Sequence, residues 1–304
     1  MKEIIFPAPL QQGDTIAICS PAGYIAHNKV YEAKKVLENE GWNVRIMPHA
    51  LGHHGNYAGT DAERLEDMLE ALNDKSVKAI LCSRGGYGVV HILDALDEFD
   101  LRSNPKWIIG YSDISALHAW ATKNRVASIH SSMVAQIMLG PDNIDNASLF
   151  SILRGHTPTF TFPACPRYDR PGTSKGRIVG GNVAVLADLI RTGYDIFEPD
   201  TILFIEDIAE PIYKIERIMY QLRFMGVLGN LAGLVVGQFT EYTPDKSYRT
   251  MEAMISDMVA PYSYPVAFNA PIGHVPHNIP VIENATVTLK VTNTSSNSLI
   301  YWNS

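Results

Sequence analysis

Short apolar runs alternate with helix-forming stretches through the first half of the chain. Four runs have the length of buried strands: Thr15–Cys19, 43–47, 77–81 and 107–109. Helices are predicted over 28–40, after a Thr-x-x-Glu capping box at 60–63, and over about 114–123. Strands that alternate with helices predict a parallel sheet covered on both faces. In such a sheet, ligands bind in the loops that follow the carboxyl ends of the strands.

The second half begins after a stretch, 141–175, that is rich in glycine and proline and has little periodicity, as is typical of a linker. The pattern beyond it predicts helices over 182–191 and 215–222, and strands over 201–205 and 234–238. Alternating threonine and valine within 285–302 favour an antiparallel hairpin. We therefore predict an α/β protein with an N-terminal domain (1–140), this linker and a C-terminal domain (176–304).

The composition narrows the classes of function. The chain has 304 residues, of which 46% are hydrophobic and 19% charged, so it has ample material for a buried core. A net charge of -7 without a basic stripe argues against nucleic-acid binding. No apolar run approaches the ~20 residues of a membrane helix. Cys19, Cys82 and Cys165 fit neither a disulfide framework nor a zinc site, so we expect a cytoplasmic protein with no metal and no cofactor.

Ser112 lies where an apolar strand meets the start of a helix, in the run GYSD (110–113). A sharp turn of this kind exposes a nucleophilic hydroxyl beside the amides of a helix N-terminus. Serine is also a good N-cap, and on this segment alone capping is the better interpretation. The run GGYG (85–88) follows the preceding strand and lacks a phosphate-loop pattern. One N–H group of that loop and the N–H of Asp113 are candidates for an oxyanion hole.

A nucleophilic serine needs a base, and the base needs an orienting group. His274 follows a predicted strand, in a loop framed by glycine and proline, and Glu206 directly follows an apolar run. A carboxylate buried at a strand end is costly unless it is paired, and an imidazolium would compensate it. The alternatives are a surface histidine and an acid at a helix N-terminus. The neighbouring His53 and His54 have no nearby carboxylate cluster that would indicate a metal site.

Taken together, these runs resemble the serine LD-carboxypeptidases over nearly the whole chain. The similar pieces are, in order, GDTIAICSPAG (13–23), YAGTD (57–61), KAILCSRGGYG (78–88), KWIIGYSDIS (106–115), GGN (180–182), FIED (204–207) with EPIY (210–213), and IGH (272–274). Each piece alone is a weak signal, but their order and separations are specific to that family.

The resemblance implies a triad in which Ser112 is the nucleophile, His274 the base and Glu206 the orienting group. It also implies an oxyanion hole made by the backbone amides of Gly86 and Asp113. The implied fold is a flavodoxin-like N-terminal domain that carries the serine and a smaller C-terminal α/β domain that carries the glutamate and the histidine. The active site would lie between the two domains, and the protein would form a homodimer.

The expected reaction is removal of the terminal D-alanine from cytoplasmic murein tetrapeptide, through an acyl-enzyme, during peptidoglycan recycling. The free terminal carboxylate of this peptide must be recognised. Arg84 is one candidate, because a guanidinium binds a carboxylate bidentately, and a structural ion pair is an equally good interpretation of that residue. Asn182, in the GGN piece, is a second candidate for substrate binding.

Three alternatives remain open at the level of sequence. The microcin-immunity branch of the same family cleaves aminoacyl-nucleotide analogues, for which Phe160, Phe162 and Tyr168 are the available aromatic residues. A non-catalytic binding protein would use a two-domain α/β fold without the triad chemistry. An esterase of the α/β-hydrolase type would need a Gly-x-Ser-x-Gly run, which Ser112 does not have.

Overall fold

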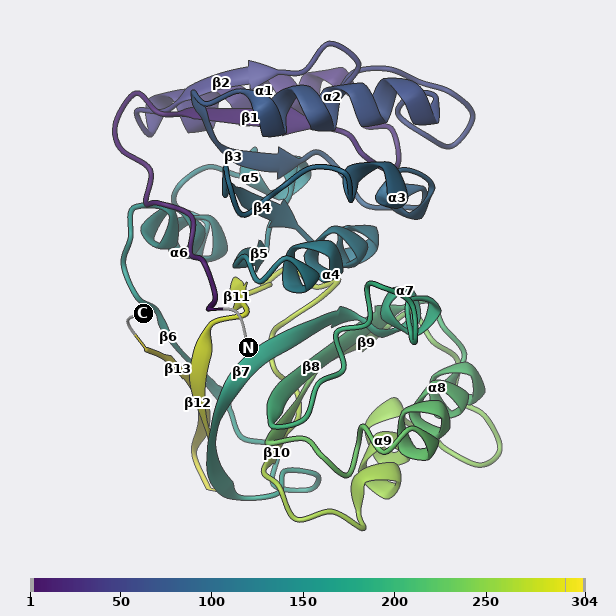
Figure 1. Cartoon of the computed structure of the whole chain (residues 1–304). Helices are drawn as coiled ribbons and strands as arrows, with labels where there is room; N and C mark the ends of the chain where they lie inside the picture. The colour runs from purple at the N-terminus through teal and green to yellow at the C-terminus, as the bar shows by residue number, and fades with distance from the viewer. Residues whose placement is uncertain (1–2, 293, 303–304) are drawn as a thin grey trace. The chain divides into compact units, whose positions relative to one another are not determined.

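The computed structural model of the protein describes residues 3–292 and 294–302. The chain forms two compact units, drawn in Figure 1. The first unit runs to His156 and also takes in Pro280–Asn284. The second unit consists of Thr157–Ile279 and the chain from Ala285 onward. Each unit is built on a sheet of its own.

The sheet of the first unit has six strands in the order β11-β5-β4-β3-β1-β2. Its strands are β1 (Thr15–Cys19), β2 (Asn43–Ile46), β3 (Val77–Cys82), β4 (Trp107–Gly110), β5 (Ser128–His130) and β11 (Val281–Glu283). The first five are parallel, and β11 pairs antiparallel with β5 at the edge. The order β2-β1-β3-β4-β5 is that of flavodoxin-like sheets, so the predicted fold class is confirmed.

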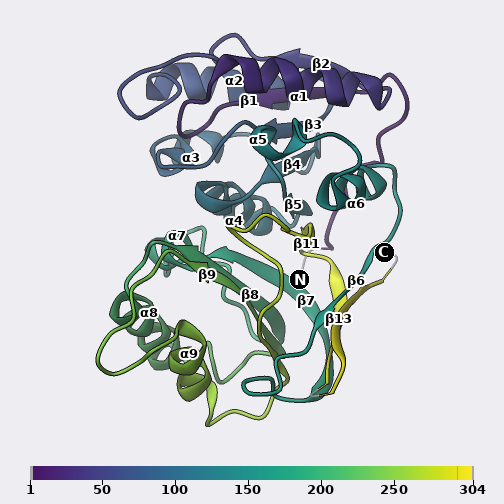
Figure 2. The ribbon, with the colours of Figure 1, turned by 180° about the vertical axis from the view of Figure 1, so that it is seen from behind.

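Helices cover both faces of this sheet. They are α1 (His27–Asn39), α2 (Asp61–Asn73), α3 (Leu93–Leu96), α4 (Ser115–Lys123), α5 (Val134–Ile137) and α6 (Ile144–Leu153). The chain passes from β1 to β2 through α1 and returns past β1 to β3 through α2, so right-handed crossovers put these two helices on opposite faces. The helix α5 packs beside α1, and α3 packs beside α2 and α4 (Figure 2).

The second unit has a seven-stranded sheet in the order β10-β9-β8-β7-β12-β13-β6. Its strands are β6 (Thr159–Pro163), β7 (Gly172–Asn182), β8 (Thr201–Ile208), β9 (Gly233–Thr240), β10 (Val266–Ala267), β12 (Thr286–Val291) and β13 (Ser296–Tyr301). The strands β7 to β10 are parallel, and the other pairings are antiparallel, including the predicted hairpin of β12 and β13.

Three helices belong to the second unit: α7 (Val183–Asp188), α8 (Ile212–Phe224) and α9 (Met251–Val259). The buried faces of α8 and α9 pack on β8 and β9 in one apolar cluster, to which Ile215, Met219 and Met254 contribute fully buried side chains. This burial is the main driving force for the unit, because apolar area removed from water contributes about 25 cal/mol per Å². Among the described residues, no helix is both long and apolar enough to span a membrane.

The predicted linker over 141–175 differs from the observed structure. This stretch contains α6, β6 and the first residues of β7, and the unit boundary falls between His156 and Thr157. The strand β6 lies at the edge of its sheet, where Pro163 is tolerated, and Phe162 is its one buried side chain. Threonine and phenylalanine alternate over 159–162, but this run is only four residues long and lies between Pro158 and Pro163, so it was included in the predicted linker.

Candidate functional site

Ser112 occupies a strained turn between β4 and α4. Tyr111 is extended, with φ -152°, and Ser112 has φ 66°, in the left-handed region that L-residues other than glycine seldom adopt. Residues Ser112–Ile114 then form one turn of 3-10 helix that leads into α4. In the part of the chain that the structure describes, the Ser112 side chain caps no N–H group. The geometry therefore fits the sharp strand-to-helix turn of a nucleophile better than the N-cap.

The glycine loop after β3 lies directly against this turn. A methyl group added to Gly85 would lie 2.7 Å from Cβ and 2.9 Å from Oγ of Ser112, and 3.3 Å from the backbone nitrogen of Asp113. Only glycine fits at this distance. The carbonyl of Gly85 accepts a hydrogen bond of 3.0 Å from the N–H of Gly23, in the loop after β1. Three loops at carboxyl ends of parallel strands therefore meet around Ser112.

The two candidate oxyanion donors, Gly86 and Asp113, directly follow the two residues of this contact. Gly86 has φ 112°, a conformation that suits glycine. Asp113 is the second residue of the turn, and the first N–H groups of a helix have no partner within it. The carboxylate of Asp113 is buried, which raises its pKa, and it accepts a hydrogen bond of 3.0 Å from the N–H of Val89. The side chain of Asp113 thus ties the chain beyond the glycine loop to the turn that holds Ser112.

His118, a buried residue of α4, supports the same turn through its hydrogen bonds. Its side chain is fully buried, with Nε2 2.9 Å from the carbonyl oxygen of Gly110 and Nδ1 2.9 Å from Oγ of Ser128. Because a carbonyl only accepts, Nε2 carries the proton and Nδ1 accepts from the serine hydroxyl. Burial lowers the pKa of His118 to about 4, so the ring is neutral at physiological pH. A histidine within a helical pattern has no distinguishing signal in the sequence, so this supporting role was not predicted.

Replacing Gly85 by alanine is expected to reduce activity while the fold is kept. The new methyl group must push Ser112 aside, since the chain has no space between the two residues. A displacement of about 1 Å at a reacting group costs on the order of 100-fold in rate. The measurement is kcat for release of D-alanine from the expected tetrapeptide substrate, with circular dichroism to verify folding. Gly229→Ala is the control, because Gly229 has no positive φ and a methyl group there meets no atom closer than 3.6 Å. Equal kcat for the Gly85 variant and wild type would contradict the contact.

Glu206 and His274 form a hydrogen-bonded pair in the second unit. Nδ1 of His274 lies 2.8 Å from Oε2 of Glu206, whose side chain is completely buried. Glu206 belongs to β8, and His274 lies in the loop that follows β10. Because a carboxylate only accepts, Nδ1 donates to it, and Nε2 becomes the basic nitrogen of the neutral ring. The histidine side chain is 15% exposed. The ring is therefore held by a buried carboxylate and is still accessible to solvent.

Two glycines leave room for the Glu206 side chain. A methyl group on Gly273 would lie 2.7 Å from Oε2 and 2.8 Å from Cβ of Glu206, and one on Gly237 would lie 3.3 Å from that Cβ. Gly273 also has φ 117°, so glycine is needed there for two reasons. The IGH run thus places a glycine against the carboxylate and the histidine directly after it.

The electrostatics of the pair suit a general base. Burial lowers the pKa of His274, but the hydrogen bond and the negative charge of Glu206, with smaller contributions from Asp207 and Glu241, outweigh it, so the pKa is raised above its ordinary 6.5. A carboxylate beside an imidazole stabilises the protonated ring. This arrangement allows His274 to accept a proton and to hold it during a reaction.

Asp207 and Asn182 support the end of β8. Asp207 accepts hydrogen bonds from the Asn182 side chain (2.8 Å) and from the N–H of Ala184 (2.9 Å), and burial raises its pKa to about 6. Asn182 is the N-cap of α7, where its side-chain oxygen accepts from the N–H of Val185. A role for Asn182 in substrate binding stays a prediction. Asp207 was not predicted as a site residue, although its position directly after Glu206 in the sequence could have indicated that it lies close to the site.

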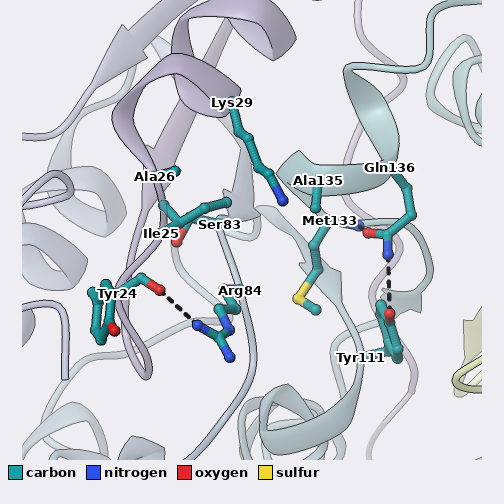
Figure 3. A pocket seen from close by; sticks show the side chains of 10 residues that line it. All are labelled: Tyr24, Ile25, Ala26, Lys29, Ser83, Arg84, Tyr111, Met133, Ala135 and Gln136. Carbon is teal, nitrogen blue, oxygen red and sulfur yellow. Dashed lines mark hydrogen bonds between the residues drawn. The ribbon is translucent and has the colours of Figure 1, made fainter. Parts of the chain in front are cut away.

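Arg84 lines a cavity of about 520 Å³ in the first unit, shown in Figure 3. Its Nη1 donates a hydrogen bond of 3.0 Å to the carbonyl of Tyr24. The structural ion pair that the sequence left open for Arg84 is not found among residues 3–292 and 294–302. Its role toward a substrate stays a prediction at this point.

The cysteines do not offer an alternative nucleophile. Cys19 and Cys82 are fully buried, and burial raises the pKa of both thiols, so they stay protonated. Cys165 is partly buried, and burial with the nearby Asp169 also raises the pKa of its thiol. Within the described residues, no group of three histidine, cysteine, aspartate or glutamate side chains is arranged to hold a metal ion.

Comparison with known proteins points to one family. The model of the LD-carboxypeptidase N-terminal domain matches residues 16–131, and that of the LD-carboxypeptidase C-terminal domain matches residues 175–289. A protein of Bacillus subtilis named "Probable murein peptide carboxypeptidase" is 33% identical over 282 residues, which are 90% of this chain and 88% of that protein.

Two solved structures show the same fold. The crystal structure of muramoyltetrapeptide carboxypeptidase from Oxalobacter formigenes matches with a TM-score of 0.84 at 26% identity, over 95% of this chain and 99% of that chain. The microcin C7 self-immunity protein in complex with aspartyl sulfamoyl adenosine matches with a TM-score of 0.83 over 97% of this chain and 98% of that chain, but at 20% identity, which is a likeness of fold alone. The chain belongs to the LD-carboxypeptidase family of peptidases.

Proposed function

We propose that the protein is a serine LD-carboxypeptidase that removes the terminal D-alanine of murein tetrapeptide. The observation that carries the proposal is the hydrogen bond of 2.8 Å between His274 and the fully buried Glu206. A carboxylate that anchors a partly exposed imidazole is the base half of a catalytic triad. Ser112, in a strained turn at the end of β4, is its nucleophile.

In the proposed mechanism, Oγ of Ser112 attacks the carbonyl of the third residue while Nε2 of His274 takes the hydroxyl proton. Glu206 keeps the ring in the tautomer with the proton on Nδ1 and stabilises the imidazolium. The C–N bond then breaks, His274 gives its proton to the leaving amine, and D-alanine departs. Water attacks the acyl-enzyme with His274 again as base, which releases the tripeptide and restores the serine.

The backbone N–H groups of Gly86 and Asp113 serve as the oxyanion hole in this proposal. Gly86 directly follows Gly85 and Asp113 directly follows Ser112, and the close contact of Gly85 with Ser112 supports this assignment. Preorganised donors of this kind stabilise the transition state by about 3–4 kcal/mol each.

The names of two relatives support the choice of substrate, since one is named for murein peptide and the other for muramoyltetrapeptide. The released tripeptide and D-alanine are building blocks for new peptidoglycan, so we place the reaction in cytoplasmic recycling of the cell wall. We further propose that the working protein is a homodimer, which sedimentation velocity tests directly.

The test is release of D-alanine from the tetrapeptide L-Ala-D-Glu-diaminopimelate-D-Ala, followed by mass spectrometry. We expect one D-alanine and one tripeptide per substrate molecule. The control is the same peptide with a terminal L-alanine, which an LD-specific enzyme leaves intact. Cleavage of neither peptide, together with cleavage of an aminoacyl sulfamoyl adenosine, would replace the carboxypeptidase with an amidase of the microcin-immunity type.

A further inference from the structure

The cavity beside Arg84 carries two positive charges and no negative one. Ten residues line it: Tyr24, Ile25, Ala26, Lys29, Ser83, Arg84, Tyr111, Met133, Ala135 and Gln136. Lys29 comes from α1 and Arg84 from the loop after β3, and both side chains extend into the cavity (Figure 3). In the described part of the chain, neither has an acidic partner. Lys34, on the same helix, is by contrast paired with Glu38 at 2.6 Å.

Lys29 does not stabilise the helix that carries it. It is the third residue of α1, and the first turn of this helix has no acidic residue. A cation at a helix N-terminus is unfavourable, because the N–H groups there already carry partial positive charge. A lysine that is unpaired and unfavourably placed for its helix, yet extends into a cavity, fits the recognition of an anion from solution.

The cavity adjoins the turn that holds Ser112, within the same unit. Ser83 and Arg84 directly precede Gly85, and Tyr111 directly precedes Ser112. The carbonyl of Gly85 accepts a hydrogen bond from the N–H of Gly23, which directly precedes Tyr24, another residue that lines the cavity. Gln136 donates to the Tyr111 hydroxyl at 3.1 Å and accepts from the N–H of Met133 at 3.2 Å, so this side of the cavity is held by hydrogen bonds.

We propose that this cavity binds the terminal carboxylate of the substrate, with Lys29 and Arg84 as a two-cation clamp. The inference rests on the proposed function. In a peptide, the terminal carboxylate is one residue, roughly 3.8 Å, from the carbonyl that is cut. The clamp must therefore lie next to the nucleophile turn, as this cavity does. A guanidinium and an ammonium around one carboxylate select a free acid over an amide, because an amide lacks the charge that both cations need.

The test compares the tetrapeptide with its C-terminal carboxamide, for wild type, Lys29→Met and Arg84→Met. Wild type is expected to prefer the acid by at least about 100-fold in kcat/KM, since each charged contact contributes about 10-fold. Each variant should lose about 10-fold on the acid, mainly through KM, and should leave the amide unchanged. Lys35→Met is the matched control, because Lys35 lies on α1, is exposed and is outside the cavity, and it should behave like wild type. The melting temperature of Lys29→Met should equal or exceed that of wild type.

A second experiment measures binding of the two peptides by calorimetry. It uses the Ser112→Gly variant, which is expected not to turn over the substrate. The acid should bind about 100-fold more tightly than the amide, and Lys29→Met should reduce this difference to about 10-fold, because Arg84 remains. If all variants release D-alanine and none prefers the acid to the amide, the proposal that Lys29 and Arg84 bind the carboxylate is wrong. The proposed function would still hold. Absence of both release and binding would overturn both proposals.

A third arm separates the two carboxylates that the peptide offers near the cut bond. Diaminopimelate at the third position is replaced by lysine, which has no side-chain carboxylate. The effect of Lys29→Met should persist with this peptide if the clamp holds the terminal carboxylate. Loss of the effect would assign the cavity to the third residue instead and would overturn the proposal.

Discussion

Replacing Ser112 by alanine is expected to abolish release of D-alanine, with kcat lower by about 10⁴-fold to 10⁶-fold. The hydroxyl is the attacking group of the proposed mechanism, and the chain offers no thiol with a lowered pKa to replace it. The measurement is single-turnover formation of D-alanine by mass spectrometry. Tetrapeptide binding should change little, because the ground state gains little from the hydroxyl.

Ser112→Gly is the matched variant, because Ser112 has φ 66° and glycine adopts this conformation without strain. Alanine keeps the strain, and glycine relieves it. The glycine variant should therefore be as inactive as the alanine variant but more stable by up to about 1 kcal/mol, measured as the free energy of unfolding. Activity within 10-fold of wild type in either variant would remove Ser112 from the mechanism.

Replacing Glu206 by glutamine is expected to lower kcat by about 10³-fold to 10⁴-fold. The glutamine amide has nearly the same shape, but it can donate a hydrogen bond to Nδ1 of His274 and so favour the wrong tautomer. It also removes the charge that stabilises the imidazolium. The measurement is kcat for D-alanine release, with the free energy of unfolding determined in parallel.

The pH profile gives the same variant a second, independent readout. The base must be neutral to accept a proton, so wild-type activity is expected to fall as the pH decreases through the raised pKa of His274, above 6.5. Without the hydrogen bond and charge of Glu206, burial dominates and lowers that pKa. The acid limb of kcat/KM should therefore move to lower pH in Glu206→Gln, although the plateau is lower.

Glu241→Gln is the control for charge alone. Glu241 is exposed and acts on His274 only through its charge, as the smallest of the contributions that raise the pKa. It should shift the acid limb much less and leave kcat nearly unchanged. An acid limb at the same pH in wild type and Glu206→Gln would show that the titrating base is not the His274–Glu206 pair.

The first four parallel strands of the first unit and the main helices between them could be predicted from local sequence patterns. Buried parallel strands need continuous apolar runs, and helices that cover them need caps and an apolar face, so Thr15–Cys19 and the capping box at Thr60 were readable locally. The flavodoxin-like order of the strands was expected from the family resemblance and not from these local patterns. The local pattern made Ser112, Glu206 and His274 candidates, and the family resemblance selected them over the alternatives of helix capping and a surface histidine.

The way in which these residues are held depends on contacts between segments that are far apart in the chain. The left-handed conformation of Ser112 and the contact with Gly85 depend on three loops meeting at one sheet edge. The hydrogen bond between Glu206 and His274 joins residues 68 positions apart. The place of β6 at the edge of its sheet and the position of Lys29 at a cavity without an acidic partner are set by segments distant in sequence, so neither could be predicted locally. The local sequence pattern indicates which residues are buried. It does not indicate which distant residues they contact, because those contacts form only when the chain folds.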